Sequence, residues 1–160
     1  MRESILKDTG LTKRRLLAGI LGSPDICGLL LDKTDAAEDE CRNLMYTQVF
    51  PYLNADGANL EVPSYICIEA GISKMPTGTI KEIQLIVWAC CDRNNMQYTK
   101  EGYEGTRVDI LADMLERQIR SQDKSGIGKP SLQTVKHIFP NNRYYGKELI
   151  FTASDFRIKG

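Results

Sequence analysis

The sequence predicts an α+β domain with a β-β-α-β-β sheet, a packed helix and a helical N-terminal segment. Three observations support this prediction: a long apolar run at residues 80–91, an apolar stripe at helical spacing within residues 107–122, and alternating segments on both sides of that stripe. The apolar fraction of 42% is ordinary for a globular domain and sufficient for a core. We expect an N-terminal helical segment over residues 1–48 and an α+β core over residues 49–160, together forming a single compact domain.

The N-terminal segment is expected to begin with a helix over residues 2–21. Thr9 and Gly10 mark the point where this helix would break or kink. A second, short helix is predicted from Ser23 to Leu31, because Ser23 suits the N-cap and Pro24 the first helical position. The apolar positions of the first helix are Ile5, Leu11, Leu16, Leu17, Ile20 and Leu21.

The next stretch, residues 32–40, is acidic. A calcium loop would need regularly spaced oxygen ligands around a central glycine, and this run contains no glycine. We therefore predict a polar loop that leads into a short helix. Residues 44–53 are apolar and aromatic with Pro51 interrupting them, and residues 54–57 form a turn.

The β region is predicted to begin with a short strand at Tyr65–Glu69, followed by a loop at residues 71–78. A long strand then covers Ile80–Cys91, where β-branched residues and the single tryptophan fit a pleated surface. Alternation at its start predicts a half-solvated strand, and the uncharged second half predicts burial on both faces. A buried helix is the alternative, but the early polar residues and the abrupt stop at residues 92–95 favour a strand.

The clearest helix is predicted at Arg107–Gln122, capped by Thr106 with Asp109 in the capping-box position. Its buried stripe consists of Val108, Leu111, Ala112, Leu115 and Ile119. Two further strands are expected at Leu132–Phe139 and Lys147–Ile158, with a turn at residues 141–146 between them. Because residues 125–130 follow a helix and lack the Gly-Lys-Ser/Thr ending, they do not form a phosphate-binding loop.

No catalytic constellation is visible. The spacing of the five cysteines provides no zinc site, and adjacent Cys90 and Cys91 would point to opposite faces of a strand. We expect reduced thiols in the core, a structural or surface role for His137, and a core position for Trp88. No metal, cofactor or disulfide is expected.

The overall charge and hydropathy of the sequence limit the classes of function that we expect for this chain. The 21 basic residues are balanced by 21 acidic ones, so the electrostatic basis for a nucleic-acid-binding protein is missing. No segment approaches the roughly 18 apolar residues of a membrane helix. The N-terminus carries charges throughout and does not resemble a signal peptide.

Seven segments of the second half follow one another in an order that resembles a known family. They are Val49–Tyr52, Tyr65–Glu69, Ile80–Ile83, Gly105–Ala112, Gly126–Lys129, Tyr145–Leu149 and Phe151–Phe156. On these segments, the sequence is similar to the small tail-terminator and neck proteins of long-tailed bacteriophages of Gram-positive hosts. The resemblance implies a sheet flanked by helices, assembled as a ring on the tail axis, commonly a hexamer, without enzymatic activity.

The expected function is therefore that of a structural virion protein, first of all a tail terminator at the head–tail junction. The resemblance implies neighbouring neck or connector proteins and tail tube proteins as partners, with assembly in the bacterial cytoplasm. A head-completion or stopper protein is the alternative within this class. A small host-directed enzyme or regulator with a cysteine nucleophile is the alternative outside it.

The candidate subunit interface is the charged side of the predicted helix at residues 107–122. Opposite charges on two patches of a ring subunit can fix the register between neighbours. The alternative is a solvated helix face whose charges pair with each other at i, i+4 spacing. The candidate residues are Arg107, Asp109, Asp113, Glu116, Arg117 and Arg120.

Overall fold

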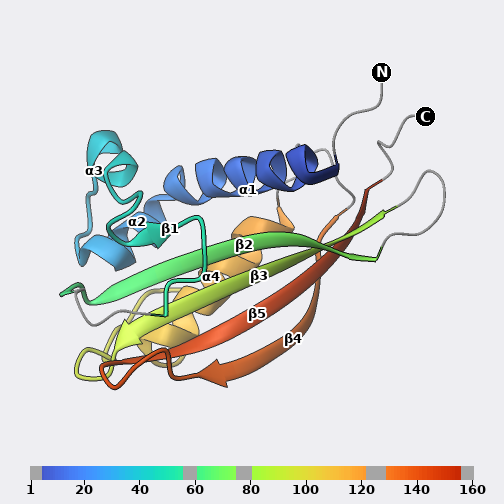
Figure 1. The fold of residues 1–160 in the computed structure, drawn as a ribbon. Coiled ribbons are helices and arrows are strands. Elements are labelled where there is room, and N and C mark those ends of the chain that lie inside the picture. Colours follow the sequence, from blue (N-terminus) through green and yellow to red (C-terminus); the bar gives the residue numbers. More distant parts are fainter. Residues whose placement is uncertain (1–4, 56–60, 75–80, 122–128, 156–160) are drawn as a thin grey trace.

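The computed structural model describes residues 5–55, 61–74, 81–121 and 129–155. Its centre is a five-stranded sheet in the order β1-β2-β3-β5-β4 (Figure 1). The predicted α+β class and the β-β-α-β-β order are confirmed, and β1 is added at one edge. The elements are α1 (Ile5–Leu21), α2 (Pro24–Leu31), α3 (Glu38–Arg42), β1 (Val49–Phe50), β2 (Ser64–Lys74), β3 (Lys81–Asp92), α4 (Arg107–Arg120), β4 (Ser131–Ile138) and β5 (Tyr144–Asp155).

Strand β3 is the centre of the sheet, as its apolar sequence predicted. It pairs antiparallel with β2 on one side and with β5 on the other, along its whole length from Lys81 opposite Asp155 to Asp92 opposite Tyr144. Strand β4 extends the sheet antiparallel beyond β5, and the short β1 runs parallel to β2. The end of β3 is buried on both faces, since Cys90 and Cys91 belong to different apolar clusters.

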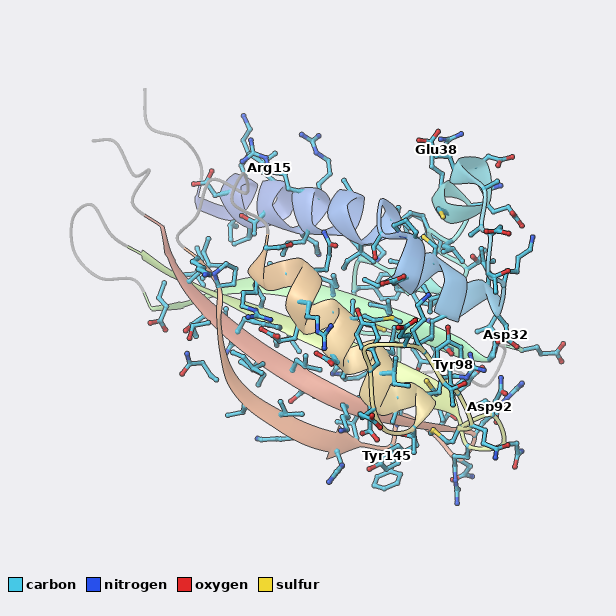
Figure 2. All side chains as sticks on the ribbon, turned by 180° about the vertical axis from the view of Figure 1, so that it is seen from behind. Arg15, Asp32, Glu38, Asp92, Tyr98 and Tyr145 are labelled. Atoms are coloured by element: carbon cyan, nitrogen blue, oxygen red, sulfur yellow. The ribbon has the colours of Figure 1, made fainter. Side chains whose placement is uncertain are left out.

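Three helices cover one face of the sheet, which we call the covered face. Figure 2 shows α1, α2 and α4 in front of the strands when the molecule is seen from behind. Helices α1 and α2 contact β2, and α4 contacts β3 and β5. The main core lies between these layers and takes residues from both the N-terminal segment and the strands.

Helix α4 forms where its sequence predicts. The hydroxyl of Thr106 accepts a hydrogen bond from the Asp109 backbone N–H, and the Asp109 carboxylate accepts one from the Thr106 backbone N–H. This capping box satisfies two backbone donors at the start of the helix. All five predicted stripe residues are buried, and Ile110 and Met114 are buried as well. Helix α4 therefore packs on two sides, against the sheet and against α1 and α2.

The opposite face of the sheet is covered only at one end, by a second and smaller cluster. Tyr65 and Tyr144 meet edge to face with ring centroids 4.9 Å apart, and their hydroxyls donate to the backbone oxygens of Asn54 and Val62. Beyond this cluster, no described helix lies over this face (Figure 1), which we call the bare face. Trp88 lies there half-buried, and its Nε1 donates to Glu148 at 3.0 Å. The prediction that Trp88 is a core residue was therefore only partly right.

Several element boundaries differ from the prediction. Strand β2 continues to Lys74, so residues 71–74 are strand and not loop; β5 begins at Tyr144, within the predicted turn. Helix α1 runs unbroken through Thr9 and Gly10 from Ile5 onward. The ends of the predicted helices and strands at residues 2–4, 122 and 156–158, and part of the turn at 54–57, lie outside the described residues. Among the described helices, none has the length and hydropathy needed to cross a membrane.

Candidate assembly surfaces

The predicted interface residues on α4 occupy different environments. Arg107 is 3% exposed, so its charge lies inside the subunit. Its guanidinium donates to the backbone oxygens of Asn95 at 2.8 Å and Leu29 at 3.2 Å, and it reaches the Asp32 carboxylate at 3.2 Å. It also lies over the Tyr98 ring, 4.5 Å from the centroid. Arg107 therefore ties α4 to α2 and to the segment after β3, and it offers no charge to a neighbouring molecule.

Asp109 is also engaged within the subunit. Its carboxylate caps α4 and pairs with Lys147 of β5. Partial burial acts to raise the pKa of Asp109, but the hydrogen bonds from Lys147 and Thr106 outweigh it and lower the pKa overall. This carboxylate therefore stays ionised and holds the start of α4 against the sheet.

The other four predicted residues lie at the surface and pair along the helix. Arg117 meets Asp113 at 2.9 Å, and Arg120 meets Glu116 at 3.0 Å, both at i, i+4 spacing. Arg117 also lies over the Tyr103 ring, 4.3 Å from its centroid. The side chains are between 23% and 53% exposed. This surface matches the alternative of a solvated helix face with its own ion pairs, and it remains accessible to a partner.

The five cysteine thiols are buried and unpaired. Burial raises the pKa of Cys27, Cys67 and Cys91 to about 12 each, and it also raises the pKa of Cys90. A nucleophilic thiol needs the opposite shift, because the thiolate is the reactive form. These four cysteines therefore have the environment of core residues and not that of a nucleophile. Among the described residues, no group of His, Cys, Asp and Glu side chains is arranged to hold a metal.

His137 was expected to have a structural or surface role. It lies exposed on β4, and its Nδ1 is 2.7 Å from the Tyr145 hydroxyl. It lies on the edge strand of the sheet, two strands away from β3, which carries Cys90 and Cys91, and its hydrogen bond is to Tyr145 and not to a thiol. The structure therefore does not bring His137 and a cysteine together.

Strand β4 is the most exposed element of the sheet. Every residue from Ser131 to His137 is exposed, and among the described residues no strand pairs with its outer edge. Helix α4 packs on β3 and β5, so the layer of helices on the covered face ends before β4 (Figure 2). Three large apolar side chains consequently meet solvent there: Leu132 at 39%, Val135 at 50% and Phe139 at 68% exposure. An exposed apolar edge strand is a template for association.

A second apolar surface lies at the other edge of the sheet. A hollow of about 380 Å³ runs between α1 and the segment that leads into β1, and it is lined by Leu17, Leu21, Met45, Tyr46 and Pro51 among others. Tyr46 is 66% exposed and has a positive φ of 66°, in the left-handed region that a bulky residue rarely adopts. A strained, exposed tyrosine is a feature from which a functional hypothesis can start.

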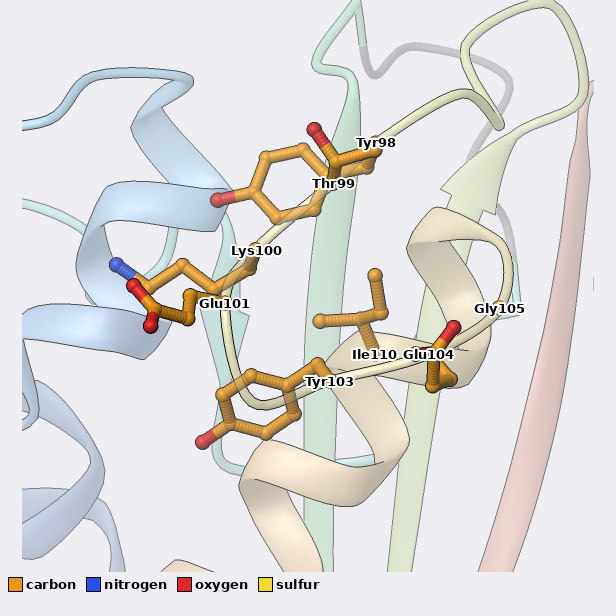
Figure 3. A pocket seen from close by; sticks show the side chains of 8 residues that line it. All are labelled: Tyr98, Thr99, Lys100, Glu101, Tyr103, Glu104, Gly105 and Ile110. Atoms are coloured by element: carbon orange, nitrogen blue, oxygen red, sulfur yellow. The ribbon is translucent and has the colours of Figure 1, made fainter.

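A second hollow, of about 360 Å³, lies beside the start of α4 (Figure 3). Tyr98, Tyr103 and Ile110 form its apolar wall, and Lys100 and Glu101 lie at its rim. Lys100 already meets Asp25 of α2 at 3.3 Å, and the Tyr103 ring is covered by Arg117. The charged and aromatic groups of this hollow are thus largely used in joining α2, α4 and the loop between β3 and α4.

The β4 edge and the hollow beside Tyr46 were not predicted as sites. The sequence contained a signal for the exposed β4 edge. The strand alternates imperfectly, and it contains fewer apolar residues than a strand that packs against a helix would need. No signal in the sequence marks Tyr46, because its exposure depends on how residues 44–49 turn back on themselves.

Comparison with known protein families identifies a match over most of the chain. The model of the YomW family matches residues 23–153, from the N-cap of α2 to a point within β5, and so includes α4 and most of both hairpins. No curated protein matches the chain.

Proposed function

The chain belongs to the YomW family, which indicates a phage-associated protein, and we propose that it is a structural component of the virion. In this proposal it forms a ring on the tail axis at the head–tail junction, as a tail terminator. A stopper or head-completion protein at the neighbouring level of the neck is the second position within the same class. The resemblance of residues 49–156 to tail-terminator and neck proteins supports the proposal, and the family match covers most of that range.

The observation that carries the proposal is the exposed β4 edge. A subunit that works alone usually protects its edge strands with charges, bulges or covering segments. Strand β4 has an irregularity between Leu132 and Thr134 and contains Lys136, but seven of its consecutive residues are exposed, and the apolar Leu132 and Val135 are among them. This favours a chain whose sheet is completed by another molecule, as expected for a subunit of an assembly.

The burial and raised pKa values of Cys27, Cys67, Cys90 and Cys91 speak against the alternative of a cysteine-dependent enzyme or regulator. A host-directed regulator would act in the infected cell and would not need to be carried in particles. A structural neck protein must be present in every particle at a fixed number of copies.

The proposal is tested on purified particles of the phage that encodes the chain. Quantitative mass spectrometry is expected to find the protein at a few copies per particle, and gold-labelled antibodies against it are expected to decorate the neck in negative-stain images. Antibodies against the major capsid protein serve as the control for label position. Absence of the chain from washed particles, or labelling on the capsid or the tail tip, would contradict the proposal.

A further inference from the structure

The hollow of about 380 Å³ between α1 and the segment that leads into β1, which we call the Tyr46 hollow, combines an apolar lining with positive charge. Its apolar wall includes Leu17, Met45 and Tyr46. Its charged lining residues are Lys13 and Arg14, and among the described residues no acidic one lines it. Arginine, methionine and aromatic residues are the types enriched at protein interfaces. The lining therefore has the composition of an interface.

The two cations of the Tyr46 hollow have different surroundings. The ammonium of Lys13 donates to the backbone oxygen of Pro51 at 2.8 Å and to the Glu69 carboxylate at 2.7 Å. Lys13 thereby joins α1 to β2 and to the chain after β1, and it fixes one side of the hollow. Arg14 is exposed and has no carboxylate partner within the described ranges of the chain. Its guanidinium is thus available to an anionic group of another molecule.

Tyr46 is held beside the hollow by a hydrogen-bonded turn. Its backbone N–H donates to the Val49 oxygen at 2.8 Å, and the Leu44 oxygen accepts hydrogen bonds from three backbone N–H groups of the same turn. The buried side chain of Gln48 ties this turn to two backbone oxygens of the core. The turn holds Tyr46 at a φ of 66°, yet its side chain is 66% exposed, so packing within the subunit does not compensate the strain. Such a residue indicates a contact with another molecule.

We propose that the Tyr46 hollow binds a segment of a partner protein in which an aliphatic or aromatic side chain is flanked by carboxylates. The apolar side chain enters the hollow against Leu17 and Met45, the ring of Tyr46 packs on it, and Arg14 pairs with a flanking carboxylate. Arginine suits this role because its planar guanidinium can donate two parallel hydrogen bonds to one carboxylate. The site deepens the proposed function, on which it rests, by stating the chemistry of one neighbour in the virion.

Charge and apolar lining together favour this occupant over two others. A nucleic-acid backbone would satisfy Arg14 through its phosphates, but it would leave the apolar wall without a partner. The β4 edge of a second copy would supply the exposed apolar side chains of Leu132 and Val135. That strand carries Lys136 and no acidic residue, so it would bring a like charge to Arg14.

Matched peptides and variants of the full chain test the site. The probes are hexapeptides with a central Leu-Leu, Met-Met or Phe-Phe pair between flanking glutamates, and the matched set has lysines in place of the glutamates. Each peptide is titrated at about 20 mM salt into the chain labelled with carbon-13 at its methionine methyl groups. The Met45 signal is assigned with Met45→Leu. Arg14→Glu and Tyr46→Asn alter the site, whereas the control Lys136→Glu reverses an exposed charge on the opposite edge strand. Thermal melts verify that each variant folds.

At least one acidic peptide is expected to shift the Met45 signal with half-saturation at or below about 1 mM. The matched basic peptide is expected to bind about tenfold more weakly, because like charges oppose association. Arg14→Glu and Tyr46→Asn are each expected to weaken binding of the acidic peptide about tenfold. Lys136→Glu is expected to leave it unchanged.

Three results would overturn the site. The first is an absence of shifts with every acidic peptide up to about 10 mM, or equal shifts with acidic and basic peptides. The second is a Met45 signal that moves on dilution of the chain alone, which would identify a second copy as the occupant. The third is a short oligonucleotide that shifts the signal more strongly than any peptide. None of these results concerns the position of the chain in the particle, which tests the proposed function separately.

Discussion

Helix α4 and strand β4 show how differently neighbouring elements of one fold can use their apolar residues. The α4 stripe is fully buried between the sheet and the N-terminal helices, whereas the apolar residues of β4 lie in solvent beyond the last helix. Both elements contain large aliphatic side chains, so hydrophobicity alone does not distinguish them. The difference teaches that the apolar residues of α4 stabilise the subunit, whereas those of β4 are left uncovered within it, and we infer that another molecule covers them.

The largest expected effect is in α4. Leu115→Ala removes a side chain with no exposure from the centre of the main core, and we expect the free energy of unfolding to fall by about 2–5 kcal/mol. The matched change in β4, Val135→Ala, is expected to alter it by less than about 0.5 kcal/mol, because that side chain is half exposed. Chemical denaturation of both variants measures the two values. Equal losses of unfolding free energy in the two variants would contradict the conclusion that α4 and β4 contribute differently to stability.

The next largest effect is expected at Arg107. Arg107→Leu removes the donors that satisfy the backbone oxygens of Leu29 and Asn95 and the interaction with Tyr98, and it should cost about 1–3 kcal/mol of stability. The control Arg117→Leu removes a surface ion pair and should cost less than about 1 kcal/mol. A change at Arg107 as small as the control would mean that this arginine is not needed inside the subunit.

A smaller effect of opposite sign is expected at Tyr46. Asparagine tolerates the left-handed backbone region better than tyrosine, so Tyr46→Asn is expected to raise the stability of the monomer by about 1 kcal/mol. Tyr46→Phe keeps the strained backbone and is expected to leave stability unchanged. If Tyr46→Asn lowered the melting temperature, the aromatic side chain would be needed for folding of the subunit.

No effect is expected from metal chelation or thiol reduction. The five cysteines are unpaired, and the described residues contain no cluster of metal ligands. Thermal melts with and without EDTA, and with and without dithiothreitol, are expected to give the same midpoint. A drop of several degrees with either reagent would show that a metal or a disulfide supports the fold.

The sequence predicted the elements whose patterns are local. The capping box at Thr106 and Asp109 and the stripe through Leu115 and Ile119 fix α4 from within a single segment. The uncharged half of β3 likewise predicts burial on both faces. This is confirmed at its end, where Cys90 and Cys91 are buried on opposite faces, whereas Ile86 and Trp88 on the bare face are only half-buried. These features could be recognised because neighbouring residues alone determine them.

The candidate site depended on distant contacts and was predicted less well. Arg107 has the spacing of a surface charge, but α2 and the segment after β3 bury it through Leu29, Asn95 and Tyr98. Strand β4 is exposed because it lies at the edge of the sheet and because α4 packs on β3 and β5 and leaves β4 uncovered. No local sequence pattern encodes either feature. The short β1 was missed because two residues that pair with β2 give no periodic signal.

The most direct test of the central claim is a reconstruction of the intact virion at a resolution that traces the chain. We expect a closed ring of this protein around the tail axis at the head–tail junction. In each subunit the main core should be unchanged, and the outer edge of β4 should lie against another molecule of the assembly. A chain located off the tail axis or absent from the particle would contradict the account, and so would a ring in which β4 remains exposed to solvent.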